Sequence, residues 1–346
     1  MRVAREVRRG QTAVYHVTCR IVAGEFLLGP HEREAFRRRL WPLAEFLQIT
    51  VHDYTVLSNH FHLVVCVPAE VTLSDQQMLD ALDKFYGSKH LKTLQFAQAC
   101  RQPDSPLLAQ LRARYLARMG NLSAYVKELK EGFSKWYNKK YERFGTLWAE
   151  RFNSSVVRQG ELELLLQCAY VDLNSVRAGL GDDPKDYPHC GYAEALAGDG
   201  PARRGLAMIL EGDTWEQKQA AYRMLLFAEG QWAPKDRAAV LEPAAVLKVL
   251  EEKGQVSIGE ILRLKVRYLT QAIAFGTEEF VEGVFAEFRQ RYYKRRKRGA
   301  WPIEEGTDWM GLTTLHKFKD GEAICAPTQI PPDPPEEPAE AGRFPL

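Results

Sequence analysis

The pattern of apolar and polar positions predicts three β-strands in the N-terminal part of the chain. Residues 13–21 (AVYHVTCRI) combine β-branched and aromatic side chains with rough alternation, which favours a strand. Residues 49–57 and 61–67 have the same character, and Ser58 and Asn59 between them are typical of a turn. We therefore expect one strand followed, after an intervening segment, by a β-hairpin.

Helical periodicity alternates with these strands. Apolar residues recur at helical spacing in 31–47, 121–138 and 160–178, which predicts three amphipathic helices. A further strand is expected within 146–157, and 74–119 is helix-rich but broken by two prolines, as in a helical insertion. This order predicts an α+β fold in which an antiparallel sheet has helices packed on one face.

The second half of the chain has a different pattern. Residues 200–298 are almost wholly helical in pattern, and 257–285 is open to two interpretations, a helix-turn-helix-like unit or an ordinary helical hairpin. We assign 1–198 to the α+β domain, 199–320 to an α-helical C-terminal extension and 321–346 to a proline-rich disordered tail.

Composition narrows the class of protein. The 346 residues are 45% hydrophobic and 27% charged, as in a soluble globular protein. No apolar run approaches the roughly 20 residues of a membrane helix, and no signal peptide follows the basic N-terminus, so no membrane partner is expected. The six cysteines lie far apart without a CxxC pair, which favours reduced thiols in a cytoplasmic protein over a disulfide scaffold or zinc ribbon.

The distribution of charge says more than its total. The net charge is only +2, but Arg8 and Arg9 belong to a basic N-terminus and 289–298 places seven cations in ten residues. Clusters of this kind are typical of phosphate-binding surfaces. A solvated helix face or a tail explains each cluster equally well, so the charge alone leaves both open.

His60 and His62 are the first candidates for chemistry. They lie two residues apart at the start of a predicted strand, so both imidazoles project from the same face. A divalent metal needs this arrangement from a pair of histidines. The alternative is a half-buried strand on which two histidines happen to fall. His16 and His52 have no neighbour at ligand spacing, and we interpret them as satisfied strand histidines.

Tyr170 and Asn174 are the second pair of candidates. They lie four residues apart on the predicted helix 160–178 and therefore share a face. A tyrosine becomes a competent nucleophile when a metal polarises the phosphate that it attacks, and a neutral asparagine oxygen can complete the metal shell. The alternative is that Tyr170 is an ordinary residue at the boundary of an amphipathic helix.

Four blocks together resemble a known family. The hairpin YTVLSNHFHLVVCVP resembles the histidine–hydrophobic–histidine signature of HUH endonucleases, in the form found in single-tyrosine transposases. WYNKKYERFGTLWAERFNSSVV is similar to a block of the REP-associated branch, AYVDLNSVRAGL resembles the segment with its catalytic tyrosine, and DYPHCGYAEAL the aromatic stretch that follows. Two departures stand out: Ser175 replaces the usual proline, and the 74–119 insertion is longer than in compact insertion-sequence members.

The resemblance implies a ferredoxin-like HUH core in residues 1–198, acting as the catalytic domain, and a DNA-engaging role for the extension. It implies a divalent Mg²⁺ or Mn²⁺ on His60, His62 and Asn174, and cleavage of single-stranded or hairpin DNA through a 5′-phosphotyrosine on Tyr170. The protein would act as a monomer or homodimer. The residues that we expect to contact DNA are Arg8, Arg9, Asn138, Lys139, Arg151, Arg177, Arg291, Lys294, Arg295 and Arg296, with Tyr292 and Tyr293 as base-stacking candidates.

Two other functions compete with this interpretation. A domesticated protein could recognise DNA hairpins without turnover, but it would have no need of His60, His62 and Tyr170. A metal-dependent phosphodiesterase could use the histidines and a water molecule, but it would leave Tyr170 without a role. Arg151 and Asn138 also have simpler explanations, side-chain packing and helix capping.

Overall fold

The computed structural model describes most of the chain. Its described residues are 7–8, 10–198, 200–227, 243–251, 256–319 and 321–328. Arg9, one of the predicted DNA contacts, and most of the predicted proline-rich tail lie outside these residues. No helix among the described residues is long and apolar enough to cross a bilayer.

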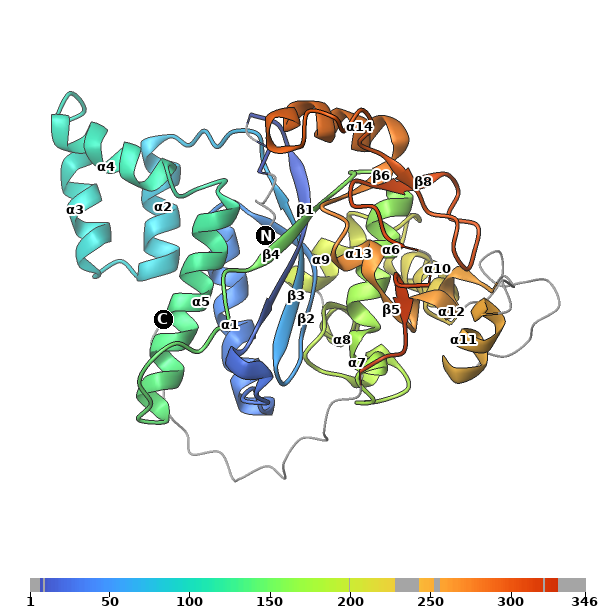
Figure 1. The fold of residues 1–346 in the computed structure, drawn as a ribbon. Coiled ribbons are helices and arrows are strands. Elements are labelled where there is room, and N and C mark those ends of the chain that lie inside the picture. The colour runs from blue at the N-terminus through green and yellow to red at the C-terminus, as the bar shows by residue number, and fades with distance from the viewer. Residues whose placement is uncertain are drawn as a thin grey trace.

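A seven-stranded sheet forms the centre of the molecule (Figure 1). The described strands are β1 (Ala13–Arg20), β2 (Thr50–Val56), β3 (His60–Val67), β4 (Asn153–Val157), β5 (Lys265–Val266), β6 (Ala274–Thr277), β7 (Trp301–Pro302), β8 (Leu312–Thr314) and β9 (Ile324–Cys325). The order in the sheet is β2-β3-β1-β4-β6-β8-β7, and all neighbours are antiparallel except β4 and β6. A small second sheet joins β5 and β9.

Helices surround this sheet. The described α-helices are α1 (Pro30–Phe46), α2 (Asp75–Tyr86), α3 (Leu91–Cys100), α4 (Pro106–Leu116), α5 (Leu122–Lys140), α6 (Glu161–Asp172), α7 (Asn174–Arg177), α8 (Gly191–Ala197), α9 (Pro201–Ala207), α10 (Trp215–Leu226), α11 (Pro243–Glu251), α12 (Ile258–Leu262), α13 (Arg267–Thr270) and α14 (Glu278–Glu287). Short 3₁₀ turns occur at Val22–Gly24, Pro184–Asp186 and Arg289–Arg291.

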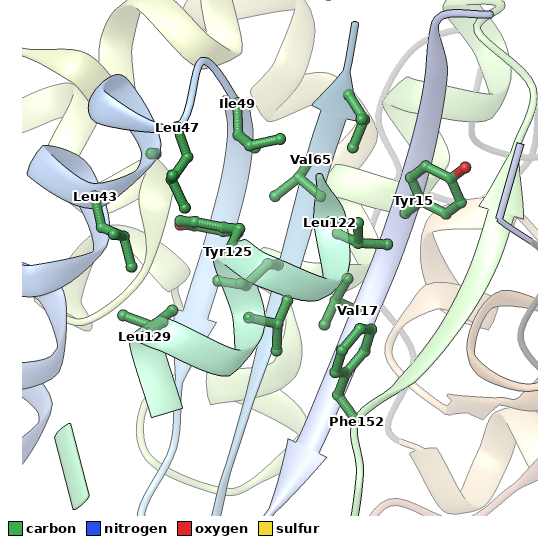
Figure 2. Close-up of a cluster of buried hydrophobic side chains, with 14 of the residues drawn as sticks. Tyr15, Val17, Leu43, Leu47, Ile49, Val65, Leu122, Tyr125, Leu129 and Phe152 are labelled. Carbon is green, nitrogen blue, oxygen red and sulfur yellow. The ribbon is translucent and has the colours of Figure 1, made fainter. Parts of the chain in front are cut away.

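Helices cover both faces of the sheet, so the expectation of helices on one face is wrong (Figure 1). On one face α1 and α5 bury Tyr15 and Val17 of β1. Figure 2 shows Leu43, Leu122 and Tyr125 among the side chains on this face. On the other face α6 and α8 share a core with Val14 and Val64. The reason lies in β1, where residues 13–17 are all buried, because a strand with apolar side chains on both faces needs cover on both.

Most of the other N-terminal predictions are confirmed. The predicted helices 31–47 and 121–138 are α1 and α5, the predicted hairpin is β2–β3, and the insertion 74–119 folds as α2, α3 and α4 (Figure 1). The strand expected within 146–157 is shorter, because only β4 pairs continuously with β1. The helix expected at 160–178 divides into α6 and α7 at Leu173.

The prediction of an all-helical C-terminal extension is wrong. β6, β8 and β7 continue the main sheet, with Val156 and Val157 of β4 paired with Ala274 and Phe275 of β6. This also rules out the helix-turn-helix-like interpretation of 257–285, which contains β5 and β6. Strands of two to four residues carry no detectable period, so tertiary pairing decides their conformation. The predicted tail began too early, since β9 pairs with β5.

A buried pair of carboxyl groups anchors the C-terminal end of α6. Asp172 accepts hydrogen bonds from the hydroxyl of Tyr222 (2.7 Å) and the backbone N–H of Tyr192 (3.0 Å), while Asp53 on β2 accepts one from its neighbour Tyr54 (2.8 Å). Burial and the charge of Asp172 raise the pKa of Asp53 well above its usual value, and burial raises the pKa of Asp172 to about 7. The pair therefore holds a proton at pH values where exposed aspartates are ionised.

The contribution of this pair to the unfolding free energy should fall as the pH rises from about 4 to 7. Over that range the unfolded chain releases protons that the folded pair retains, so the unfolded state binds fewer protons and unfolding becomes easier. Asp53→Asn removes the like charge beside Asp172 and should remove this contribution, so the unfolding free energy of the variant relative to the wild type should rise with pH, measured by urea denaturation at several pH values. Asp182→Asn, at an exposed position, is the control. An unchanged slope in Asp53→Asn would show that the pair does not titrate in this way.

Candidate active site

The four residues predicted to carry chemistry line one cavity. His60 and His62 come from β3, Tyr170 from α6 and Asn174 from α7, and the cavity has a volume of about 430 Å³. The C-terminal segment completes the wall with Lys265, Thr270, Gln271, Pro327 and Thr328. Segments far apart in the sequence therefore meet around the predicted metal ligands and nucleophile.

The two β3 histidines present their rings to each other. Their ring centroids lie 5.0 Å apart at an interplanar angle of 70°. His60 Nδ1 lies 2.5 Å from Asn59 Oδ1, and Asn59 Nδ2 donates to the carbonyl of Gly24 at 3.4 Å. The amide oxygen can only accept, so His60 carries its proton on Nδ1 and a lone pair on Nε2.

A third histidine fixes the tautomer of His62. The carbonyl of Leu269 accepts a hydrogen bond from His16 Nδ1 (2.9 Å), so His16 Nε2 is an acceptor. His62 Nδ1 lies 2.9 Å from this nitrogen and must therefore donate to it. The remaining nitrogen, His62 Nε2, is buried, carries a lone pair and has no hydrogen-bond partner among the described residues. This orientation is typical of a metal-ligating histidine with an outer hydrogen-bond partner.

The environment keeps these imidazoles neutral. Burial, followed by the positive charges of Arg20 and Arg177, lowers the pKa of His60 to about 3. Burial and the neighbouring histidines lower the pKa of His62 well below its usual value, and burial lowers the pKa of His16 to about 4. Neutral imidazole is the form that binds a metal ion, so the lone pairs are available near neutral pH.

The donor set fits a divalent ion that takes part of its shell from a ligand. Asn174 Nδ2 donates to the carbonyls of Tyr170 (3.2 Å) and Val171 (3.0 Å), which leaves Oδ1 as the acceptor of this side chain. No group of three His, Cys, Asp or Glu side chains in the described part of the chain could hold a metal by itself. His60, His62 and the Asn174 oxygen therefore offer an incomplete shell, as in sites where phosphate oxygens supply the rest.

Arg177 holds Tyr170 in place. Its guanidinium carbon lies 3.7 Å from the centroid of the Tyr170 ring, and it donates hydrogen bonds to the carbonyls of Tyr170 and Leu262. Burial lowers the pKa of Arg177 to about 10, so it remains a cation at neutral pH. These contacts lie within the protein, so Arg177 supports Tyr170, and its predicted contact with DNA stays a prediction.

Positive charge dominates the wall of the cavity. Arg20, Arg151, Arg177 and Lys265 line it, and Glu150 is the one acidic residue among the lining residues that the structure describes. A cleft lined mainly by one sign of charge attracts ligands of the opposite sign. The wall therefore suits a phosphate group, and Arg151 stays a predicted DNA contact.

Two of the predicted DNA contacts, Arg8 and Asn138, have partners within the protein. Arg8 forms an ion pair with Glu287 at 2.9 Å, which joins the N-terminus to α14. Asn138 Nδ2 donates to the carbonyl of Gly145 at 3.0 Å and holds the loop after α5. This bond fastens the loop and does not cap the helix, so the predicted DNA contact of Asn138 stays a prediction, and Lys139 is exposed on the last turn of α5.

The cations of segment 289–298 divide into two groups. Arg296 donates to the carbonyls of Gly299 (2.9 Å) and Leu315 (2.6 Å), and Arg291 lies over the ring of Phe288 at 4.7 Å. These arginines support the local fold. Lys294 and Arg295 are exposed, as expected for a surface that meets a charged partner.

The two tyrosines of that segment also differ. Tyr292 packs on Phe285 with ring centroids 5.2 Å apart, so its predicted role in base stacking gives way to packing. Tyr293 has 82% of its surface exposed and lies beside Lys294 and Arg295, so it stays a base-stacking candidate. None of these residues lines the cavity described above.

Sequence reasoning missed His16 as part of the site. It lies opposite Val64 on β3, diagonal to His62, and only the register of β1 on β3 brings the two imidazoles together. Forty-six positions separate His16 from His62 in the chain, so no local spacing signals the contact. Lys265, Thr270 and Gln271 escaped notice for the same reason.

Comparisons with known proteins add a structural likeness. No family model and no curated protein matches the sequence. Among solved structures, one described as a REP-associated tyrosine transposase bound to a REP hairpin is similar to this chain, with 14% identity and a TM-score of 0.38. The match covers 62% of this chain and 92% of that one. It is a distant structural relation, from which no residue role is taken.

Proposed function

We propose that this protein cuts and rejoins DNA by the chemistry of single-tyrosine HUH transposases, with Tyr170 as nucleophile. One observation carries the proposal. A phenol, an amide and two neutral imidazoles, one of them with its Nε2 unpartnered among the described residues, line one positively charged cavity, although they come from separate segments. His62 Nε2 is buried without a hydrogen-bond partner among the described residues, as is His52 Nε2, but His62, unlike His52, lines a cavity together with a second imidazole and an amide, which supports a metal-dependent reaction over a purely structural role.

The proposed reaction exchanges one phosphodiester bond for another. The Tyr170 oxygen attacks the phosphorus, a Tyr–O–P bond forms, and the P–O3′ bond breaks. The 3′ oxygen leaves as a hydroxyl with the proton that the phenol gives up, and the 5′ phosphate stays on Tyr170. A 3′-hydroxyl can reverse the step, so joining needs no external energy source.

The residues of the cavity divide the remaining work. Mg²⁺ or Mn²⁺, held by His60, His62 and Asn174, would stabilise negative charge on the non-bridging phosphate oxygens. Arg20, Arg151 and Lys265 would bind the flanking phosphates and orient the strand. Single-stranded or hairpin DNA is the proposed substrate, because the attack requires an accessible phosphodiester in a cavity of this size.

Tyr170→Phe is the decisive test. The change removes only the hydroxyl, so the unfolding free energy should shift by no more than about 1 kcal/mol. Covalent protein–oligonucleotide adducts on a denaturing gel should vanish, and cleavage of a hairpin oligonucleotide should fall to background. Peptide mapping of the wild-type adduct should place the nucleotide on the peptide that contains Tyr170.

Tyr141→Phe is the matched control, because the Tyr141 hydroxyl donates to Glu32 at 2.5 Å and lies outside the cavity lining. This variant should form adducts at the wild-type level. An adduct in Tyr170→Phe would place the nucleophile elsewhere. Cleavage without any adduct in the wild type would favour a phosphodiesterase that uses water, and hairpin binding without cleavage would favour a binding protein.

The exposed cations of segment 289–298 should contribute to DNA affinity. Replacing Lys294 and Arg295 by Gln should weaken DNA binding and flatten its dependence on salt, by roughly one unit of slope for each lost phosphate contact. Binding would be measured by fluorescence anisotropy at several salt concentrations. Lys89→Gln and Arg101→Gln, at exposed positions of the helical insertion, remove the same charge as a control. Equal effects from both pairs would indicate a general charge effect without a defined contact surface.

A further inference from the structure

Two backbone carbonyls of the C-terminal segment accept hydrogen bonds from side chains that contact His62 and Tyr170. Leu269 on α13 accepts a hydrogen bond from His16, and Leu262 at the end of α12 accepts one from Arg177. His16 in turn contacts His62, and Arg177 contacts Tyr170. His62, a predicted metal ligand, and Tyr170, the predicted nucleophile, are thus each connected to the C-terminal segment through one buried side chain.

The His16 connection controls which nitrogen of His62 carries the proton. A carbonyl can only accept, so the Leu269 carbonyl sets His16 as the Nδ1–H tautomer, and His16 Nε2 then requires a proton on His62 Nδ1. The two rings lie nearly parallel, with an interplanar angle of 6° and centroids 5.1 Å apart. An apolar ring of the same size at position 16 would fill the space but leave the Leu269 carbonyl and the His62 N–H without partners.

The Arg177 connection acts on the backbone of α6. Its planar guanidinium donates to the carbonyls of Tyr170 and Leu262 and covers the Tyr170 ring at 3.7 Å from the centroid. A lysine at this position could not bridge two carbonyls and stack on the ring together. The α12 segment and the tyrosine are therefore held at a fixed distance from each other.

The C-terminal segment is itself fixed to the main sheet. The carbonyl of Ile273, just after α13, accepts a hydrogen bond from the backbone N–H of Val156 of β4 at 2.8 Å, and the backbone N–H of His316 donates to the carbonyl of Ala272 at 2.9 Å. β6 then continues the sheet beside β4. These contacts hold the Leu269 carbonyl at a defined position relative to β1.

We infer that residues 256–328 form a positioning half of the active site. Through His16 they hold His62 in the tautomer that points a lone pair into the cavity, and through Arg177 they hold Tyr170. His16 and Arg177 are positioning residues in this scheme. The catalytic purpose of this arrangement rests on the proposed function, but its geometry can be tested without DNA or metal.

Nitrogen NMR of the full chain labelled with ¹⁵N-histidine, without metal, reads the tautomers directly. In the wild type, His62 and His16 should both carry the proton on Nδ1, with Nε2 unprotonated. In His16→Phe the population of His62 protonated on Nε2 should rise. His52→Phe is the matched control, since His52 is another buried strand histidine and lies outside the cavity lining. It should leave the His62 signals unchanged.

Metal affinity gives a second readout. Titration with Mn²⁺ alone should show 10- to 100-fold weaker binding in His16→Phe, the range typical of lost outer-shell partners, and no change in His52→Phe. His16→Gln keeps an acceptor for the His62 N–H and should recover part of the affinity. If His16→Phe fails to fold, His16→Gln and the wild-type tautomers still decide the question.

The Arg177 connection is tested by Arg177→Lys in the cleavage reaction. A positioning role predicts at least a tenfold lower kcat with an unchanged KM for the oligonucleotide, while the His62 tautomer stays as in the wild type. A raised KM at unchanged kcat would make Arg177 a DNA contact and overturn this half of the inference.

Failure of the inference and failure of the proposed function give different results. A wild-type His62 protonated on Nε2, or a His62 tautomer and Mn²⁺ affinity unaffected by His16→Phe, would overturn the inference even if Tyr170 forms adducts. Conversely, absence of any Tyr170 adduct would overturn the proposed reaction, while the Nδ1–H tautomers of His16 and His62 would still establish the positioning geometry.

Discussion

The pairing of β1 with β3 is the constraint on which the site depends. In this register Thr18 lies opposite His62 and Arg20 opposite His60, and alternation along β1 places His16 on the same face as both. A slip of one residue would turn His16 to the opposite face, away from His62. The burial of β1 on both faces prevents such a slip, because the two cores require opposite sets of its side chains. The geometry of the site is therefore a consequence of packing in the centre of the sheet.

The helix that carries Tyr170 is held by polar contacts at its C-terminal end. Asp172 is fixed by Tyr222 and Tyr192, while Arg177 reaches back to the Tyr170 carbonyl. These groups are buried, and burial of polar groups is tolerated only when their hydrogen bonds are made. The contacts come from α7, α8 and α10, all of them C-terminal to the tyrosine in sequence. The position of the phenol thus depends on parts of the chain that share no local pattern with it.

Sequence analysis could predict the elements whose periodicity is long enough to detect. The strands β1 to β3, the helices α1 and α5, and the shared faces of His60 with His62 and of Tyr170 with Asn174 all follow from spacing of two or four residues. Strands such as β6 and β7 were missed because two to four residues carry no period, and their pairing partners decide their conformation. The interpretation of His16 as a histidine with satisfied hydrogen bonds is confirmed, but its partner could not be named. The same interpretation of His52 is wrong, because its Nε2 is buried without a hydrogen-bond partner among the described residues. The contact between His16 and His62 depends on the register of β1 against β3 and on the backbone carbonyl of Leu269. Neither leaves a signature in a single sequence.

The positive side chains of the cavity have two electrostatic effects, one on the pKa of His60 and one on the attraction of a phosphate group. Arg20 and Arg177 help to lower the pKa of His60, which keeps its lone pair free for a metal ion. The same positive potential, together with Arg151 and Lys265, favours a phosphate group in the cavity. A divalent cation alone would meet repulsion from these residues, whereas an anionic strand would relieve it. Under the proposed function, metal and DNA should therefore bind more tightly together than either does alone, since the anionic strand offsets the positive charge that opposes the metal. This coupling would keep the nucleophile and the metal from acting together until a phosphate is present.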